Sequence, residues 1–321
     1  MKRITLERHQ VWVYLTGLLI GILVGGLLPG SGSLLEKLIW PVLAVLLYST
    51  FLQVPLLHVR QAFGDRRFGS AVLTGNFVLM PLVVWALVQW LPDNAPLRLG
   101  VLLVLLVPCT DWFISFTQLG GGDVPRAVAV TPLNLLFQLC LLPLYLWAMT
   151  DSQLSAVLSL GDVAPALLIV LLPLVAAAIS ERWIEAQTGR EVLRDTLAWW
   201  PIPLLGLVIL LVAAVQVSTL QAALAWLPWV IPIYVAYLVS AALVAKLQAR
   251  LWQLPDSQGR TLAFSLGTRN SFVVLPFALG LPNGWEVAAL VIVVQSLVEL
   301  FGMLVYLRWI PRGLFAGIKN A

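Results

Sequence analysis

The sequence predicts an all-α membrane protein in which ten transmembrane helices form two inverted repeats of five helices each. Three observations support this fold class: the composition, the recurrence of long apolar runs, and the uneven distribution of basic residues between the loops. Of the 321 residues, 60% are hydrophobic and 11% are charged, whereas an average soluble domain carries roughly 25% charged residues. The composition therefore excludes a water-soluble fold.

Apolar runs long enough to cross the hydrocarbon core as a helix recur along the whole chain. The first run follows a basic segment, as in a signal peptide, but it lacks a small-x-small cleavage pattern and predicts a span. The ten predicted spans are residues 11–28, 35–55, 69–91, 97–119, 127–149, 161–180, 198–217, 224–249, 261–281 and 286–309.

The basic residues predict the orientation of these spans. With the N-terminus in the cytoplasm, all but three of the 19 Lys and Arg residues lie in cytoplasmic segments. The exceptions are Lys37 and Arg98, which lie outside, and Arg269, which lies within a span. Cytoplasmic loops carry an excess of Lys and Arg. We therefore expect a multi-pass protein of a bacterial-type inner membrane, with both termini in the cytoplasm.

An odd number of spans in each half predicts inverted repeats. A duplicated five-span unit inserts its second copy upside down, an arrangement common among secondary transporters. The expected units are residues 1–150 and 151–321. In each unit one span, the fourth or the ninth, has its apolar run interrupted by polar residues. Interruptions at corresponding positions of two halves indicate a binding site.

The two interruptions contain residues that favour a helix break. Pro108 removes a backbone donor and Gly267 tolerates unusual backbone angles, so we expect each helix to unwind beside them. The residues expected to bind substrate at these breaks are Cys109, Thr110, Asp111, Arg269, Asn270 and Ser271.

Three charged residues are predicted at membrane depth: Asp111, Arg269 and Glu299. Each costs about 2.5–3.5 kcal/mol to insert, so each needs a partner or water. Asp111 and Arg269 occupy matching places, which predicts a charge pair at the midplane. The alternative is that Asp111 only caps the second half-helix and Arg269 only bonds to unwound carbonyls. Helix N-termini and a guanidinium would suit an oxyanion or a polar neutral solute, but not a sodium ion.

Several other polar residues in the spans have two interpretations. Asn76, Asn134, Gln138 and Gln295 are candidates for the wall of a cavity, and structural hydrogen bonds between helices are the alternative for each. Cys109 lies where a thiophilic solute would reach it, although a cysteine in an apolar helix is ordinarily a packing residue.

No motif for catalysis, metal binding or nucleic-acid binding occurs in the sequence. Cys109 and Cys140 lie inside apolar runs, so no disulfide framework is expected. His9 and His58 have no partner at metal-ligand spacing. We therefore expect no catalytic residue, no metal and no cofactor; the expected partners are the lipid bilayer and a small-molecule substrate, with no nucleic acid.

The motifs around the breaks resemble those of the bile acid:sodium symporter superfamily, and within it the arsenite-efflux permeases of the arsenical-resistance type. Pro-Cys-Thr at 108–110 is followed, thirteen residues after Cys109, by Gly-Asp, the same spacing as in the arsenite permeases. Residues 134–138 are similar to that family's Asn-Ser-x-Phe-Gln, residues 75–81 resemble its third span, and Glu299 is similar to its acidic tenth span. The resemblance implies a panel domain and a core domain, two broken helices that cross in the core, and alternating access at the crossing.

The sequence departs from this family at the breaks. Residues 270–274 read Asn-Ser-Phe-Val-Val where arsenite permeases read Asn-Asn-Phe-Glu-Leu, so the glutamate tied to proton-coupled export is absent. Asp111 replaces a small residue, and Arg269 precedes the asparagine. Compared with the sodium-coupled branch, Ser265 and Arg269 replace a glutamate and a glutamine that help to bind sodium. The chain thus resembles a divergent arsenical-resistance-type member without sodium coupling.

The function expected first is a secondary transporter that exports arsenite, or a related small oxyanion or metalloid hydroxide, driven by the proton gradient. Cys109 would contact the metalloid, and Asp111 or Glu299 would carry the proton. The alternative is a small organic-anion transporter in which Arg269 contacts the anion and Cys109 only packs. A membrane enzyme or a sensor is least favoured, because the sequence carries no paired catalytic constellation and no soluble domain.

Overall fold

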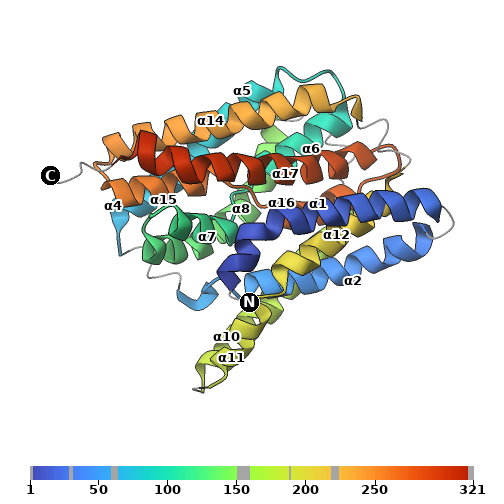
Figure 1. Ribbon diagram of the computed structural model, residues 1–321, viewed down its shortest axis with the longest axis horizontal. Helices are drawn as coiled ribbons and strands as arrows, with labels where there is room; N and C mark the ends of the chain where they lie inside the picture. Colours follow the sequence, from blue (N-terminus) through green and yellow to red (C-terminus); the bar gives the residue numbers. More distant parts are fainter. Residues whose placement is uncertain are drawn as a thin grey trace.

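The computed structural model describes residues 3–28, 32–58, 64–149, 160–187, 189–217 and 224–316. Within these ranges the chain forms helices joined by short connections (Figure 1). Eight helical segments are long and apolar enough to cross a membrane. The architecture therefore confirms an all-helical protein of the multi-pass membrane class. The boundary expected between two halves, at residues 150 and 151, lies outside the described ranges.

Up to Met149, the described part of the chain alternates long helices with shorter ones. The elements are α1 (Arg3–Leu27), α2 (Gly32–Phe51), the short 3-10 helix η2 (Leu56–His58), α4 (Arg66–Thr74), the π-helical turn η3 (Gly75–Leu79), α5 (Met80–Val88), α6 (Ala95–Leu105), α7 (Trp112–Leu119) and α8 (Val124–Met149).

The second part repeats the alternation of long and short helices. Its elements are α10 (Leu160–Glu185), α11 (Glu191–Leu197), α12 (Pro201–Val215), α14 (Leu227–Leu251), α15 (Asp256–Gly267), α16 (Ser271–Leu279), α17 (Glu286–Trp309) and the π-helical turn η4 (Ile310–Leu314). At the places of the fourth and ninth predicted spans the chain forms two pairs of shorter helices, α6 with α7 and α15 with α16.

A proline explains the irregular turn in the middle of the α4–η3–α5 segment. Pro81 has no N–H, so it cannot donate to the carbonyl of Phe77 four residues earlier. The hydroxyl of Tyr145, on α8, donates to this carbonyl at 2.6 Å. The freed backbone acceptor is thus satisfied by a neighbouring helix, which is how transmembrane helices tolerate proline.

The helices pack in two groups. In the four-helix group, α1 packs on α12, α12 on α2, and α2 on α10. The site group comprises α4 to α8 and α14 to α17, with close pairs that include α6 with α17 and α14 with α15. Figure 1 shows α1, α2 and α12 lying together, α14 and α17 above them in this view, and α10 with α11 projecting from the body. Contacts of α16 with α10 and α2, and of α1 with α17, join the two groups.

Glycines allow α1 and α12 to approach at backbone distance. Gly17, Gly21 and Gly25 are spaced four residues apart, so they lie on one face of α1. A Cβ atom added at any of the three would collide with a carbonyl oxygen of α12. Small residues at such an interface let two membrane helices pack closely.

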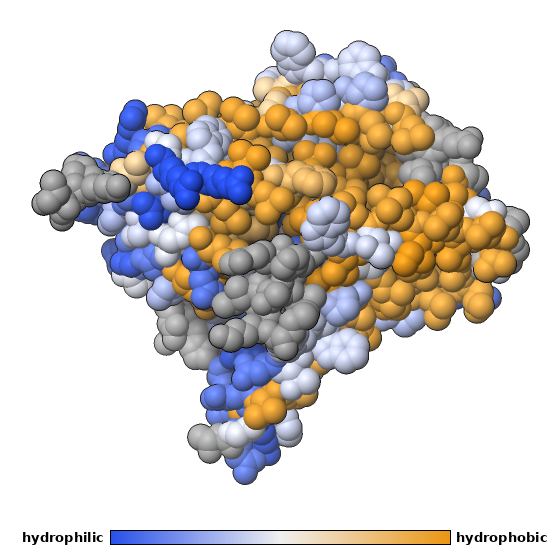
Figure 2. Space-filling view, in the orientation of Figure 1, coloured by the Kyte–Doolittle hydropathy of each residue, from blue (hydrophilic) through white to orange (hydrophobic). Residues whose placement is uncertain are grey.

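Apolar side chains cover most of the visible surface of the protein (Figure 2). Hydrophilic side chains gather at the left edge of this view and on the projecting end of α10 and α11. Large exposed hydrophobic residues such as Leu172, Ile179 and Leu243 lie on the outer faces of long helices. A surface of this kind is stable against lipid acyl chains rather than water.

Candidate functional site

The two helix breaks lie against each other. The chain between α6 and α7 and the chain between α15 and α16 form an antiparallel bridge at Pro108 and Arg269. The N–H of Cys109 donates to the carbonyl of Thr268 at 3.1 Å, and the N–H of Asn270 donates to the carbonyl of Val107 at 2.8 Å. Each unwound segment therefore satisfies backbone groups of the other, as buried polar groups require.

Local sequence accounts for the ends of the second pair of helices. The hydroxyl of Thr268 donates to the carbonyl of Phe264 at 2.8 Å, and Thr268 itself has extended backbone angles that end α15. The side chain of Asn270 accepts from the N–H of Val273 and caps α16. At the first break Asp111 occupies the N-cap position of α7 but makes no side-chain cap hydrogen bond. The alternative interpretation is therefore wrong for Asp111 as a helix cap, although Arg269 does bond to carbonyls at the breaks, as the same alternative expected.

The guanidinium of Arg269 is buried in a cage of neutral oxygen atoms. The side chain donates to Asn76 Oδ1 at 2.8 Å and to the carbonyls of Leu266 at 2.7 Å, Ser265 at 3.3 Å and Leu105 at 3.4 Å. Only 3% of Arg269 is exposed. Two of these carbonyls belong to the last turn of α15 and one to the end of α6, where the helix dipole is negative. The helix ends thus stabilise the buried positive charge.

The expected direct pair between Asp111 and Arg269 does not form. In the described part of the chain the two side chains make no ion pair with each other. The backbone N–H of Arg269, rather than its guanidinium, contacts a carboxylate, donating to Glu299 Oε2 at 2.8 Å. The carbonyls left by the unwound turns compete successfully for the guanidinium, because its hydrogen bonds to them need no second buried charge.

Glu299 ends a hydrogen-bonded chain that begins at the second break. Ser271 donates to Gln295 Oε1 at 2.9 Å, and Gln295 Nε2 donates to Glu299 Oε2 at 2.7 Å. Glu299 is 1% exposed, and its other oxygen, Oε1, has no hydrogen-bond partner among the residues that the structure describes. A buried carboxyl oxygen of this kind is where a proton would be held.

A thiol and a carboxylate are adjacent at the first break. The thiol of Cys109, which is 1% exposed, donates to Asp111 Oδ1 at 3.1 Å. Thr110 accepts a hydrogen bond from Asn270 Nδ2 at 3.2 Å, so these side chains also connect the two breaks. All six residues expected to bind substrate therefore lie at or directly beside the bridged segments.

The four neutral candidates for a cavity wall fall into two sets. Gln295 belongs to the Glu299 chain, and Asn76 bonds to both Arg269 and Ser265, the latter at 3.0 Å. Asn134 and Gln138 are buried one turn apart on α8, and their amide atoms bond to no side chain or backbone group in the described ranges.

Three aromatic residues at the crossing were not expected from the sequence. Tyr14 of α1 stacks on Trp112 of α7 with ring centroids 5.7 Å apart and planes at 6°. Trp112 also contacts Phe272 of α16 at 5.2 Å. The positions of Trp112 and Phe272, directly after the polar residues of each break, are a signal that could have found them. Tyr14 lies in an ordinary apolar run and carries no such signal.

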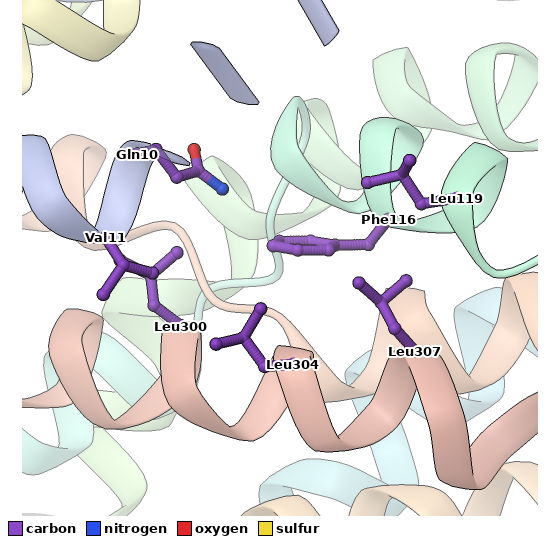
Figure 3. Close-up of a pocket in the computed structure, with 7 residues that line it drawn as sticks. All are labelled: Gln10, Val11, Phe116, Leu119, Leu300, Leu304 and Leu307. Carbon is purple, nitrogen blue, oxygen red and sulfur yellow. The ribbon is translucent and has the colours of Figure 1, made fainter. Parts of the chain in front are cut away.

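A pocket of about 190 Å³ lies between α1, α7 and α17 (Figure 3). Figure 3 shows Phe116 and the amide of Gln10 directed toward the space between these helices. Six of its seven lining residues are apolar: Val11, Phe116, Leu119, Leu300, Leu304 and Leu307, with Gln10 as the seventh. The pocket thus joins the four-helix group to the site group.

Within the described residues, no group of three or more His, Cys, Asp or Glu side chains is arranged to hold a metal ion. The side chains of His9 and His58 lie outside the described part of the structure.

These features define a class: a multi-pass helical membrane protein with a polar site where two interrupted helices meet. The chain belongs to the Sodium Bile acid symporter family, whose sequence profile matches residues 40–224. The matched region contains the first break and ends before the second, so Arg269 and its neighbours lie beyond it.

Two curated proteins match parts of this chain. The chain is 31% identical over 128 residues to a Pseudomonas aeruginosa protein described as "Uncharacterized protein PA2026", covering 39% of this chain and 38% of the relative. It is 26% identical over 201 residues to the arsenical-resistance protein Acr3 of Corynebacterium glutamicum, covering 56% of this chain and 54% of the relative. The matches therefore span about two fifths and about half the length of these relatives. The family profile and the match to Acr3 confirm the resemblance to the superfamily and to its arsenical-resistance branch.

Proposed function

We propose that the protein is a secondary active transporter that exports arsenite, as neutral arsenous acid, or a related metalloid hydroxide, by alternating access. The observation that carries this proposal is the hydrogen bond from the Cys109 thiol to the Asp111 carboxylate at the meeting point of the two breaks. Arsenic(III) is thiophilic, and soft sulfur ligands select such partners. The likeness to an arsenical-resistance protein supports the same cargo.

The thiol and the carboxylate together suit a reversible exchange at arsenic. The Cys109 sulfur forms a bond to arsenic while one As–O bond breaks. The thiol proton passes to Asp111 and then to the departing hydroxide, which leaves as water, and no atom changes its oxidation state. The reverse steps release arsenous acid. A single thiol holds the metalloid weakly enough for release, whereas several would retain it.

The surroundings of Arg269 disfavour the organic-anion alternative. An anion would have to compete with Asn76 and three carbonyls for the guanidinium. The carboxylate of Asp111 lies beside the Cys109 thiol. This carboxylate would repel an anion, but it would accept hydrogen bonds from the hydroxyl groups of a neutral solute. A neutral cargo therefore fits the site better.

We propose that protons, rather than sodium ions, drive this export. The oxygen cage at the end of α15 already contains a fixed cation, the Arg269 guanidinium, so a sodium ion would meet like charge there. Glu299 is the stronger candidate for the proton carrier, with Asp111 as the other. Protonation of Glu299 would weaken its bond to the Arg269 N–H and so change the geometry of the second break.

Inverted repeats over residues 1–150 and 151–321 are proposed as the framework for this movement. Several helix contacts occur in pairs that exchange of the halves would relate: α1 with α12 and α10 with α2, and likewise α17 with α6 and α8 with α15. The four-helix group would correspond to the panel, and the site group to the core. The distribution of basic residues supports cytoplasmic termini in an inner membrane.

An arsenite-resistance assay tests the proposed cargo. We expect Cys109→Ser to abolish arsenite resistance in a sensitive host at unchanged protein level, because the sulfur ligand is lost. Cys140→Ser is the matched control, since Cys140 is an exposed free cysteine on α8, and should keep full resistance. Proteoliposomes with imposed proton or sodium gradients, assayed with arsenite, antimonite and organic acids, identify the coupling ion. Full resistance in Cys109→Ser would refute the role of the thiol.

A further inference from the structure

The Tyr14–Trp112 stack lies one helical turn from the pocket lining on both α1 and α7. Along α1, Tyr14 lies four residues after Gln10, and along α7, Trp112 lies four residues before Phe116. Gln10 and Phe116 both line the pocket. One turn of each helix therefore leads from the pocket to the stacked rings. Along α7 the order is therefore Phe116 at the pocket, Trp112 in the stack and Asp111 at the break.

The stack joins parts of the protein that belong to different groups. Tyr14 is on α1, in the four-helix group, while Trp112 and Phe272 are on α7 and α16, in the site group. Phe272, directly after the second break, contacts the same Trp112 ring at 5.2 Å. Movement of one group relative to the other would have to separate Tyr14 from Trp112.

The hydroxyl of Tyr14 is buried without a partner. Tyr14 is fully buried, and its hydroxyl makes no hydrogen bond to any residue in the described ranges. A buried hydroxyl without a hydrogen bond is costly and calls for an explanation.

We propose that Tyr14 and Trp112 form a gate over the Cys109–Asp111 pair, and that the Tyr14 hydroxyl contacts the cargo when the gate opens. Closed stacking excludes solvent from the thiol. When α1 moves away from α7, the pocket becomes continuous with the site, and a hydroxide group of the cargo supplies the partner that the phenol lacks. The second part of this inference rests on the proposed function, whereas the gate itself does not.

Chemical labelling of Cys109 tests the gate without any cargo. In a Cys140→Ser background Cys109 is the sole cysteine, and its rate of reaction with N-ethylmaleimide is measured by mass spectrometry in proteoliposomes. We expect Tyr14→Leu and Trp112→Leu each to raise this rate roughly two- to tenfold, the effect of losing one aromatic pair. Tyr14→Phe retains the ring and should label at the wild-type rate. Trp90→Leu is the control, because Trp90 is 77% exposed and lies just after α5, outside both breaks.

The outcomes distinguish the gate from the cargo contact. Wild-type labelling in whichever of the two leucine variants folds would overturn the gate. With labelling unchanged, Tyr14→Phe should lower arsenite transport and weaken the protection of Cys109 by arsenite. Normal transport and protection in Tyr14→Phe would overturn the hydroxyl contact alone. Faster labelling in the leucine variants, with no effect of arsenite on the wild-type protein, would leave the gate in place and contradict the proposed cargo.

Discussion

Arg269 illustrates at the residue scale how a charge is kept inside an apolar protein. Its guanidinium donates to an amide oxygen and to carbonyls at two helix ends, and its side chain also lies over the ring of Tyr237 at 5.2 Å. These acceptors exist because α6 and α15 end within the protein. The break and the buried cation therefore stabilise each other: the arginine satisfies orphaned carbonyls, and the carbonyls replace the solvation that the arginine has lost.

This interpretation predicts a large effect for a conservative substitution. Lysine has one charged nitrogen and cannot reach Asn76 and both ends of the cage together. We expect Arg269→Lys to reduce the free energy of unfolding by about 1.5–3 kcal/mol, the range for hydrogen bonds to a charged group. Thermal unfolding in detergent measures this loss. Arg308→Lys, at an exposed position on α17, should have little effect, and equal stability of the two variants would contradict the cage.

At the scale of elements, the interface of α1 and α12 is made mainly by backbone. The three glycines of α1 face Gly206, Leu210 and Ala214 of α12, at the same four-residue spacing. At these three glycines of α1 there is no room for a side chain. Tyr14, about one turn before Gly17, is therefore positioned by a close contact of the two helices.

Substitution at this interface tests its tightness. In Gly21→Leu the new side chain would collide with the carbonyl of Leu210. Overpacking of this kind typically costs about 1–3 kcal/mol, so we expect lower thermal stability and less folded protein in a fluorescence-detected size-exclusion assay. Gly26→Leu is on the same helix, where an added Cβ meets nothing within 4 Å, and should behave as wild type. Similar profiles for the two variants would show that the helices can separate without cost.

At the scale of the whole molecule, some features could be predicted from the sequence and others could not. The helical class and the two interrupted regions follow from apolar run length, from Pro108 and from the polar cluster after Gly267. One of the two interpretations of the sequence had Arg269 bonding to unwound carbonyls, and three of its four acceptors are such carbonyls. Which carbonyls these are could not be predicted, because every residue has one. Tyr14 was missed for a related reason: its stacking depends on how α1 meets α7, and nothing in its own segment specifies that contact.

Salt bridges also connect segments of the site group that are distant in sequence. Arg126, at the start of α8, pairs with Asp65, which precedes α4, at 2.7 Å, and with Asp123. The backbone N–H of Asp123 donates to Thr261 of α15 at 2.7 Å. Partial burial raises the pKa of Asp65, but the N–H of Phe68 and the Arg126 guanidinium outweigh it, so the pKa lies below its usual value of 3.8.

The depressed pKa of Asp65 predicts how acid affects this connection. Its stabilising contribution is present above the usual pKa and is lost as the pH falls through the lower pKa of the folded protein. Asp65→Asn keeps a capping side chain but removes the charge, and we expect it to cost less than about 1 kcal/mol at pH 7 because Arg126 is partly exposed. The free energy of unfolding is measured between pH 7 and pH 3. The difference in this free energy between variant and wild type should shrink toward the acid end. A difference that does not depend on pH would contradict this role.

The main-chain bridge between Pro108 and Arg269 has a consequence for the history of such proteins. The link uses the N–H groups of Cys109 and Asn270 and the carbonyls of Val107 and Thr268, which nearly any amino acid supplies. Mutations at Thr110, Asp111 or Ser271 can therefore alter the chemistry of the recognition surface while the scaffold that presents it persists. Proteins with this arrangement can therefore change substrate specificity through single substitutions at the site, while the fold stays the same.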